Sequence, residues 1–414
     1  MMTRSVEFGE KPKIMAPDLQ KLQHLLIEYN DSDRPSSLAI NILSMAKKAL
    51  HLVPETSQEV KTWHMFLDFT SKPAYLEALP DRETRYQWAE VVFKIIQITR
   101  FSLKDLFLQR VDEHRQDILF QDMSQPTMTQ FSYEQVYRHV REIAAVFHDT
   151  AGKDPRVAIF CENSVESASC DLACLFYDMF VTPLNIHFSK DILVSIFNQL
   201  EISIVVTDTN HRLDILEAAR KETKHAFTIY VTDSNIRLRA EGDDFLGERC
   251  KSLSEYRIIS ILEKRKRKPI HEVATTMFTS GTTGIPKGVS FSVYNLVSKR
   301  FARGAALPGI GSDEIMLCYL PLYHTFGRYL EMLGTIYWGG KYVFVGNPSK
   351  ETLLKLFPKI SPTIFISVPL RWAQLHEEAT ERMEVEQDSR KRKQILKKIV
   401  GKRLKWGLSA AGYL

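Results

Sequence analysis

Cysteine is scarce in this chain. Only five of its 414 residues are cysteine, and this odd, low number argues against a disulfide framework. Cys170 and Cys174 lie one helical turn apart, but no histidine or second cysteine pair completes a metal-binding set. We therefore interpret the cysteines as buried apolar residues.

Long apolar runs are missing as well. The best candidate for a membrane span, near residues 172–184, contains Asp178, and the N-terminus has no compact apolar segment of the kind found in signal peptides. We therefore expect a cytoplasmic protein and leave peripheral contact with a membrane surface open.

The charge balance is close to even. The net charge is +5, which fits anionic small ligands or an anionic membrane surface and does not call for nucleic acid. A basic run at residues 263–268 is interpreted as a solvated loop, with contact to phosphate or a membrane as the alternative.

The first 99 residues carry a helical pattern and no catalytic cluster. Prolines separate four apolar patterns of helical spacing, and Asp18 is a candidate N-cap for the first of them. The first pattern consists of Leu19, Leu22, Leu25, Leu26 and Tyr29. We predict a helical extension over residues 1–99, whose role and partner the sequence leaves unknown.

The most informative stretch is residues 275–289, which read Thr-Thr-Met-Phe-Thr-Ser-Gly-Thr-Thr-Gly-Ile-Pro-Lys-Gly-Val. A mostly apolar start predicts the end of a strand, and hydroxyl residues interleaved with glycines follow it. Glycines let backbone N–H groups approach phosphate oxygens, hydroxyls add donors, and a lysine neutralises charge. The stretch therefore predicts a polyphosphate site made of Thr279, Ser280, Gly281, Thr282, Thr283, Gly284 and Lys287.

This stretch differs from the common phosphate loops. Counted from Gly281, the second glycine position of a mononucleotide P-loop holds Pro286, and Gly288 replaces the Ser or Thr that follows the lysine. The spacing of a dinucleotide site is absent too. A flexible Gly/Thr linker is the bland alternative, but a linker has no reason to place Pro and Lys at these offsets behind a strand.

The stretch resembles the phosphate-binding motif of the adenylate-forming superfamily, which includes acyl-CoA synthetases, luciferases and the adenylation domains of peptide synthetases. The family core, hydroxyl-Ser-Gly-Thr-Thr-Gly-x-Pro-Lys-Gly, is complete from Thr279 to Gly288. The resemblance implies that Thr279–Gly284 and Lys287 hold the leaving pyrophosphate, and that Thr279 also touches Mg²⁺.

A second motif is Pro-Leu-Tyr-His-Thr-Phe-Gly-Arg at residues 321–328, after an apolar run. A lone histidine behind a strand is more often packed than catalytic. Here the run resembles the family's Pro-Leu-x-His-x-x-Gly motif, whose histidine lies near the acyl group and the adenylate. His324 and Lys287 are therefore the candidate catalytic residues. Arg328 makes the run similar to the long-chain acyl-CoA synthetase subgroup.

Two later segments support the same resemblance. The strand that ends in Val-Pro at Pro369, followed by Trp372, resembles the wall of an acyl tunnel in long-chain synthetases. The acyl pocket implied by the resemblance consists of His324, Arg328, Pro369 and Trp372. The small residues Ala410, Ala411 and Gly412 resemble the segment that lies against adenine, which a flat base must approach closely.

Alternating strands and helices after residue 100 predict a parallel, helix-covered sheet. The resemblance implies the α/β fold of the family's large domain, with layered sheets, over residues 100–414. We expect this AMP-binding domain to be incomplete at its C-terminus and residues 1–414 to be inactive alone. The family's Glu, Asp and late Lys, which hold Mg²⁺, the ribose and the α-phosphate, would lie further on.

The implied activity is an acid–thiol ligation in two steps. A fatty acid, of long chain by resemblance, attacks ATP to form acyl-adenylate with Mg²⁺ as cofactor, and CoA then displaces AMP. Two alternatives stay open from the sequence. The acyl group could pass to the phosphopantetheine of a carrier protein, or be released as acyl-adenylate; or the chain could bind nucleotide or fatty acid without turnover.

Overall fold

The computed structural model describes residues 15–236, 238, 243–265, 267–279, 286–346, 349–383 and 388–409. Its residues form two compact units. One contains the described residues up to Phe101 together with Val297–Ile310, and the other contains Ser102–Leu296 and the described residues from Gly311 onward.

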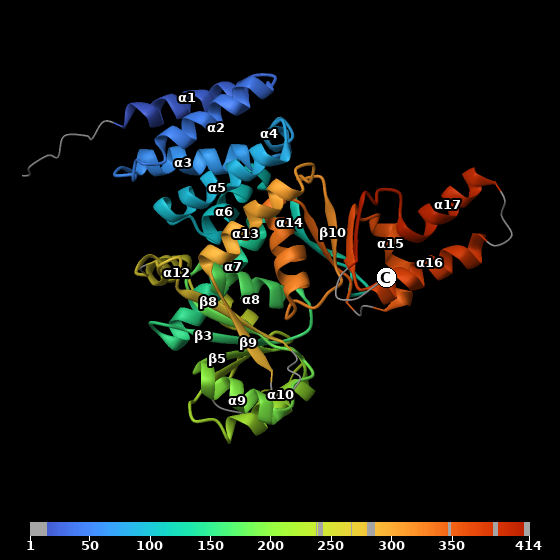
Figure 1. The fold of residues 1–414 in the computed structure, drawn as a ribbon. Helices are drawn as coiled ribbons and strands as arrows, with labels where there is room; N and C mark the ends of the chain where they lie inside the picture. Colours follow the sequence, from blue (N-terminus) through green and yellow to red (C-terminus); the bar gives the residue numbers. More distant parts are fainter. Residues whose placement is uncertain are drawn as a thin grey trace, which may run out of the picture. The chain divides into compact units, whose positions relative to one another are not determined.

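The first unit is helical, as predicted (Figure 1). It contains α1 (Pro17–Asp31), α2 (Ser36–Ala49), α3 (Ser57–Thr70), α4 (Pro73–Leu76), α5 (Arg82–Thr99) and most of α13 (Val293–Ala306). The expected N-cap Asp18 is wrong: α1 begins at Pro17 with Ala16 before it, because proline suits the first helical position, where its missing N–H costs nothing.

A buried hydroxyl links two helices of this unit. The side chain of Thr70 donates to the carbonyl of Phe66 at 2.7 Å and accepts from the indole Nε1 of Trp88 at 2.8 Å. Thr70 and Trp88 are both inaccessible to solvent. A buried indole N–H needs such a partner, so this hydroxyl fixes how α3 and α5 pack.

The second unit contains two sheets. The seven-stranded sheet has the order β7-β6-β5-β3-β4-β8-β9 and is parallel except for the antiparallel pair β8–β9. Its strands are β3 (Arg156–Phe160), β4 (Phe180–Pro183), β5 (Ile204–Thr207), β6 (Thr228–Val231), β7 (Asp244–Phe245), β8 (Val273–Thr279) and β9 (Lys287–Ser292).

The six-stranded sheet has the order β13-β12-β10-β11-β1-β2 and is parallel except for β1–β2. Its strands are β1 (Ile118–Asp122), β2 (Thr129–Ser132), β10 (Ile315–Cys318), β11 (Lys341–Phe344), β12 (Ile364–Ser367) and β13 (Trp406–Ser409). The predicted layered α/β fold is therefore confirmed.

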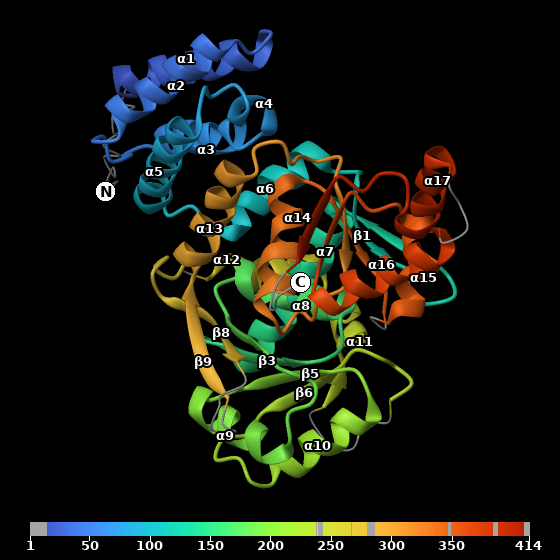
Figure 2. The ribbon, with the colours of Figure 1, turned by 45° about the vertical axis from the view of Figure 1, so that its right-hand side comes forward.

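Helices cover these sheets. Helices α9 (Lys190–Leu200) and α10 (Asn210–Arg220) pack on one face of the seven-stranded sheet, while α8 (Val165–Phe176) lies on the other (Figure 2). Strands β4 and β5 are buried at every position, as parallel strands covered on both faces must be. The remaining helices are α6 (Leu103–His114), α7 (Tyr133–Ala151), α11 (Leu246–Lys251), α12 (Glu255–Glu263), the π-helix η1 (Phe326–Met332), α14 (Leu333–Trp338), α15 (Lys350–Ile360), α16 (Pro369–Met383) and α17 (Ser389–Val400).

Several smaller expectations have definite outcomes. All five cysteines are buried and free, as interpreted from the sequence. Asp178 has a φ of +57°, in the left-handed region that favours glycine. Within the described residues, no helix combines the length and apolarity that crossing a membrane requires.

Candidate functional site

The phosphate-loop stretch connects the two strands of a β-hairpin. Strand β8 ends at Thr279 and β9 begins at Lys287, and these two residues are direct cross-strand partners. Side chains of such partners lie on the same face of a sheet, so the Thr279 hydroxyl and the Lys287 ammonium share one face at the mouth of the loop. The loop residues themselves, Ser280, Gly281, Thr282, Thr283 and Gly284, lie outside the described residues.

Hydroxyl groups attach this hairpin to the sheet. The ladder between β4 and β8 pairs Val181 with Thr275, whose buried hydroxyl also donates to the Val181 carbonyl at 2.6 Å. One step along, the hydroxyl of Thr182 donates to the carbonyl of Thr276 at 2.9 Å. Threonines here therefore extend a short main-chain ladder, which explains why an interior strand carries polar residues.

The second motif forms a turn at the carboxyl end of β10 in the other sheet. Asn163, which follows β3, holds this turn with two bonds: its Nδ2 donates to the Leu320 carbonyl, and its Oδ1 accepts from the Leu322 N–H, each at 2.9 Å. Sequence reasoning missed this role because Asn163 and the turn are more than 150 residues apart. The two sheets thus meet at the candidate site.

His324 lies in this turn with an exposed ring. The backbone N–H of Phe326 donates to its Nδ1 at 3.3 Å, so a neutral ring carries its proton on Nε2. Although the residue as a whole is exposed, neighbouring atoms remove part of the water around the imidazole, and this desolvation lowers the pKa of His324. The imidazole is therefore neutral near pH 7 and can offer an Nε2–H donor to an anionic group.

Gly327 explains the glycine of the motif. A Cβ at this position would lie 2.4 Å from the Pro321 carbonyl oxygen and 2.5 Å from that of Leu320. The π-helix η1 therefore begins directly against the turn, and only glycine lets the two backbones approach so closely. π-Helical turns are rare and frequently occur at functional sites.

Arg328 is completely buried, and its guanidinium forms a bidentate pair with Asp171 on α8 at 2.5 and 2.7 Å. It also donates to the hydroxyls of Thr275 at 2.7 Å and Tyr329 at 3.0 Å. The Asp171 charge raises the pKa of Arg328 against the opposing effect of burial. The assignment of Arg328 to an acyl pocket stays a prediction, and these contacts favour a structural role instead.

The other predicted acyl-pocket residues lie in the first turn of α16, which follows β12. Pro369 is the first residue of α16, and the Trp372 indole donates to the Leu408 carbonyl at 3.1 Å on the neighbouring strand β13. The Trp372 ring packs so closely over Gly407 that a Cβ there would lie 2.8 Å from it. The predicted adenine segment Ala410–Gly412 continues from β13 outside the described residues.

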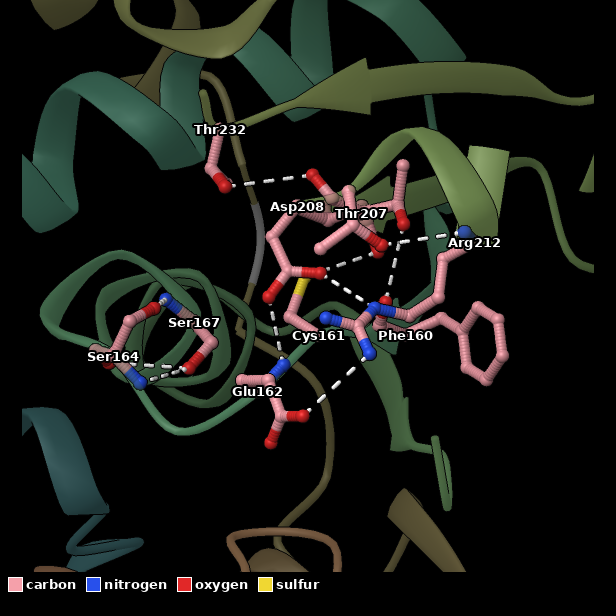
Figure 3. Close-up of polar contacts among 11 residues, drawn as sticks. Phe160, Cys161, Glu162, Ser164, Ser167, Thr207, Asp208, Arg212 and Thr232 are labelled. Atoms are coloured by element: carbon pink, nitrogen blue, oxygen red, sulfur yellow. Dashed lines mark hydrogen bonds and ion pairs between the residues drawn. The ribbon is translucent and has the colours of Figure 1, made fainter. Parts of the chain in front are cut away.

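A polar cluster lies at the carboxyl ends of β3 and β5 (Figure 3). The N–H of Glu162 donates to Asp208 at 2.9 Å, and Arg212 donates to the same carboxylate at 2.6 Å. From β3 the chain continues to β4, toward one edge of the sheet, whereas from β5 it continues to β6, toward the other edge. Open α/β sheets commonly bind ligands at such a point, where the direction of the strand order reverses. Here the charged groups pair with one another and fix the backbone directly before Asn163.

The basic run at 263–268 is partly used inside the unit. Arg267 forms a bidentate pair with Asp105 at 2.8 and 3.0 Å, and Lys268 pairs with Asp154 at 2.5 Å. Arg267 stays exposed and Lys268 is half-buried, so these surface pairs tether a loop that remains in contact with solvent, as the solvated-loop interpretation expects.

For Mg²⁺, the described residues supply little. Thr279 offers one hydroxyl, whose nearest partner is the Lys287 carbonyl at 3.4 Å, whereas Mg²⁺ prefers a full octahedral set of oxygens. The described part of the chain contains no cluster of three potential metal-ligating residues. These residues alone do not fit the ion.

Comparison with known proteins adds the relationships of the chain. Residues 107–411 match a family model described as AMP-binding enzyme. Long-chain-fatty-acid–CoA ligase 5 of Mus musculus is 30% identical over 237 residues, which cover 53% of this chain and 33% of that protein. Long chain acyl-CoA synthetase 8 of Arabidopsis thaliana is 26% identical over 260 residues, covering 58% and 35%. The chain thus spans about a third of the length of these curated relatives.

Among solved structures, ATP-bound MatB from Rhodopseudomonas palustris has a TM-score of 0.58 at 20% identity, covering 75% of this chain and 55% of that one. A long-chain-fatty-acid CoA ligase described as putative, from the same organism, has a TM-score of 0.57 at 17% identity, covering 67% and 65%. At this identity, the similarity shows a shared fold.

Proposed function

The chain belongs to the AMP-binding enzyme family. We propose that it is part of an ATP-dependent acid–CoA ligase whose substrate is a long-chain fatty acid. The observation that carries the proposal is the hairpin that places Thr279 opposite Lys287, on one face at the mouth of the phosphate loop. A hydroxyl and an ammonium at this point suit the β- and γ-phosphates of a bound nucleotide.

In the proposed first step, a carboxylate oxygen of the acid attacks the α-phosphorus of ATP. The new O–P bond gives acyl-adenylate, and the bond to the β-phosphate breaks to release pyrophosphate. Both reactants are anions, so positioning and charge neutralisation dominate the catalysis. Lys287 neutralises charge on the leaving pyrophosphate, while the neutral Nε2–H of His324 orients the acid.

In the proposed second step, the thiol sulfur of CoA attacks the acyl carbonyl. A thioester bond forms, the bond from carbonyl carbon to phosphate oxygen breaks, and AMP leaves as the thiol loses its proton. Two features support a long-chain acid in particular. The relatives named above are long-chain ligases, and Arg328 and Trp372 stand in motifs similar to that subgroup.

The test is fatty-acid-dependent ATP–pyrophosphate exchange by the full-length protein, with acids from acetate to palmitate, followed by detection of acyl-CoA. Each methylene buried in an apolar tunnel should contribute up to about 0.8 kcal/mol, or roughly fourfold in kcat/KM, until the tunnel is filled. An optimum at acetate would refute the long-chain substrate. Exchange without acyl-CoA would refute CoA as the acceptor, and absence of exchange with every acid would refute the ligase.

A further inference from the structure

The site contains two substrate-binding parts that belong to different segments. The phosphate loop extends from the β8–β9 hairpin, whereas His324 lies in the turn after β10, in the other sheet. Attack on the α-phosphate requires the acid and the nucleotide to be aligned within about an ångström. Some contact must therefore hold the hairpin and the turn at a fixed separation.

Within the described residues, a continuous path of hydrogen bonds connects them, beside a ring contact between Phe291 and Tyr329. The N–H of Arg328 donates to the His324 carbonyl at 3.0 Å, so Arg328 stands one turn of helix after the histidine. Its guanidinium then donates to the Thr275 hydroxyl at 2.7 Å, on the strand that ends at Thr279. Thr275 in turn donates to the Val181 carbonyl at the register point between β4 and β8.

We propose that Arg328, held by Asp171, is a positioning residue that fixes the phosphate-loop hairpin relative to the turn carrying His324. The inference rests on the proposed function and deepens it. Asp171 orients the guanidinium with two bonds, which leaves NH1 directed at Thr275. Because Thr275, Asp171 and Arg328 are all nearly or wholly inaccessible to solvent, water cannot replace these bonds.

Thr275 offers the cleanest perturbation. Removing Asp171 or Arg328 would leave a buried charge unpaired and endanger the fold. Thr275→Val removes only the hydroxyl and keeps the side-chain volume, while the Arg328–Asp171 pair remains. Thr275→Ser keeps the hydroxyl and loses a methyl group. Comparison of the two variants therefore distinguishes the loss of the hydrogen bond from Arg328 from a general loss of stability.

Thr70→Val is a matched control in the helical unit. Its hydroxyl is equally buried, also donates to a main-chain carbonyl and also accepts from a side-chain N–H. Replacement of Thr70 by valine should lower the free energy of unfolding and leave the rate of ATP–pyrophosphate exchange unchanged.

The first measurement is ATP–pyrophosphate exchange by the full-length protein. Thr275→Val should lower kcat by about tenfold, while KM for ATP and for the acid changes by less than about threefold, because alignment and not binding is lost. Thr275→Ser should stay within about twofold of wild type. Wild-type kcat in Thr275→Val, or equal losses in both Thr275 variants, would overturn the inference.

The second measurement does not depend on activity. Hydrogen exchange should become faster in Thr275→Val both in the hairpin, residues 276–279 and 287–291, and in the turn at 321–325. It should remain slow at both places in Thr275→Ser. Faster exchange in the hairpin alone would overturn the connection. If the wild-type protein shows no exchange of pyrophosphate, the proposed function fails, and the hydrogen-exchange result still decides whether Arg328 couples the two segments.

Discussion

Gly327→Ala is the substitution whose consequence follows most directly from the structure. The added Cβ would meet the carbonyl oxygens of Pro321 and Leu320 at 2.4 and 2.5 Å, whereas real Cβ contacts essentially never fall below 3.0 Å. Both obstacles are backbone atoms, and Asn163 holds the same turn by two hydrogen bonds. No side chain can rotate away, so either the turn or the start of η1 must move.

This geometry gives an estimate of how much Gly327→Ala lowers the free energy of unfolding. Overpacking a well-packed core typically costs about 1–3 kcal/mol, and the upper end applies where the neighbours are fixed backbone. A loss of about 3 kcal/mol changes the folding equilibrium by roughly 150-fold and lowers the melting temperature by several degrees. The same movement displaces His324, so exchange activity should fall further than the folded fraction explains.

Gly247→Ala is the matched control. Gly247 lies in α11, where an added Cβ would have no heavy atom within 4 Å, and its φ is not in the left-handed region. Alanine there should raise the free energy of unfolding by about 0.4–1 kcal/mol. Thermal unfolding and pyrophosphate exchange of both variants form the assay. A Gly327→Ala variant that melts within a degree of wild type and retains its activity would refute the backbone clash.

Three further predictions follow from other residues. Lys287→Ala should lower the rate of pyrophosphate exchange at least about tenfold, a loss of about 1.5–3 kcal/mol of charge-assisted bonding. Lys221→Ala, at another exposed lysine, should leave this rate unchanged, and equal rates in the two variants would show that Lys287 is not part of the site. Glu201→Gly should raise the free energy of unfolding by about 0.5–1 kcal/mol, because Glu201 ends α9 with a φ of +50°, and an unchanged or lower melting temperature would contradict this. Burial lowers the pKa of His148 in the folded protein, while in the unfolded chain its pKa is near 6.5. The neutral ring therefore contributes stability above pH 6.5, and this contribution is lost as the pH falls through the folded-state pKa. Between pH 7 and 5, wild type should therefore lose more stability than His148→Gln, and parallel curves would refute the assignment.

The sequence by itself determined the features that depend on neighbouring residues. Helical spacing and prolines predicted the helices of the N-terminal unit, and buried apolar runs predicted the parallel strands. The run from Thr279 to Gly288 was sufficient for the family, which the match over residues 107–411 confirms. These features could be predicted because backbone periodicity and phosphate-loop chemistry each depend on residues that are close together in the sequence.

The sequence also left local errors. The charged run over residues 377–398 is typical of one long helix, but α17 begins separately at Ser389 with Asp388 as its N-cap. The Asp388 side chain accepts from the N–H of Arg390, which ends any helical conformation at that residue. An aspartate inside a charged run gives no periodic signal, so the break was hidden.

Only the tertiary structure decided which distant residues share the site. Asp171 and Arg328 are 157 residues apart, and Arg328 and Thr275 are 53 apart, so no local pattern could pair them. The structure also adds Val297–Ile310 to the helical unit, far along the chain from its other residues. Partners of buried polar groups are chosen by the order of strands in the sheets, because each buried charge must bond to whatever donor or acceptor the topology brings beside it.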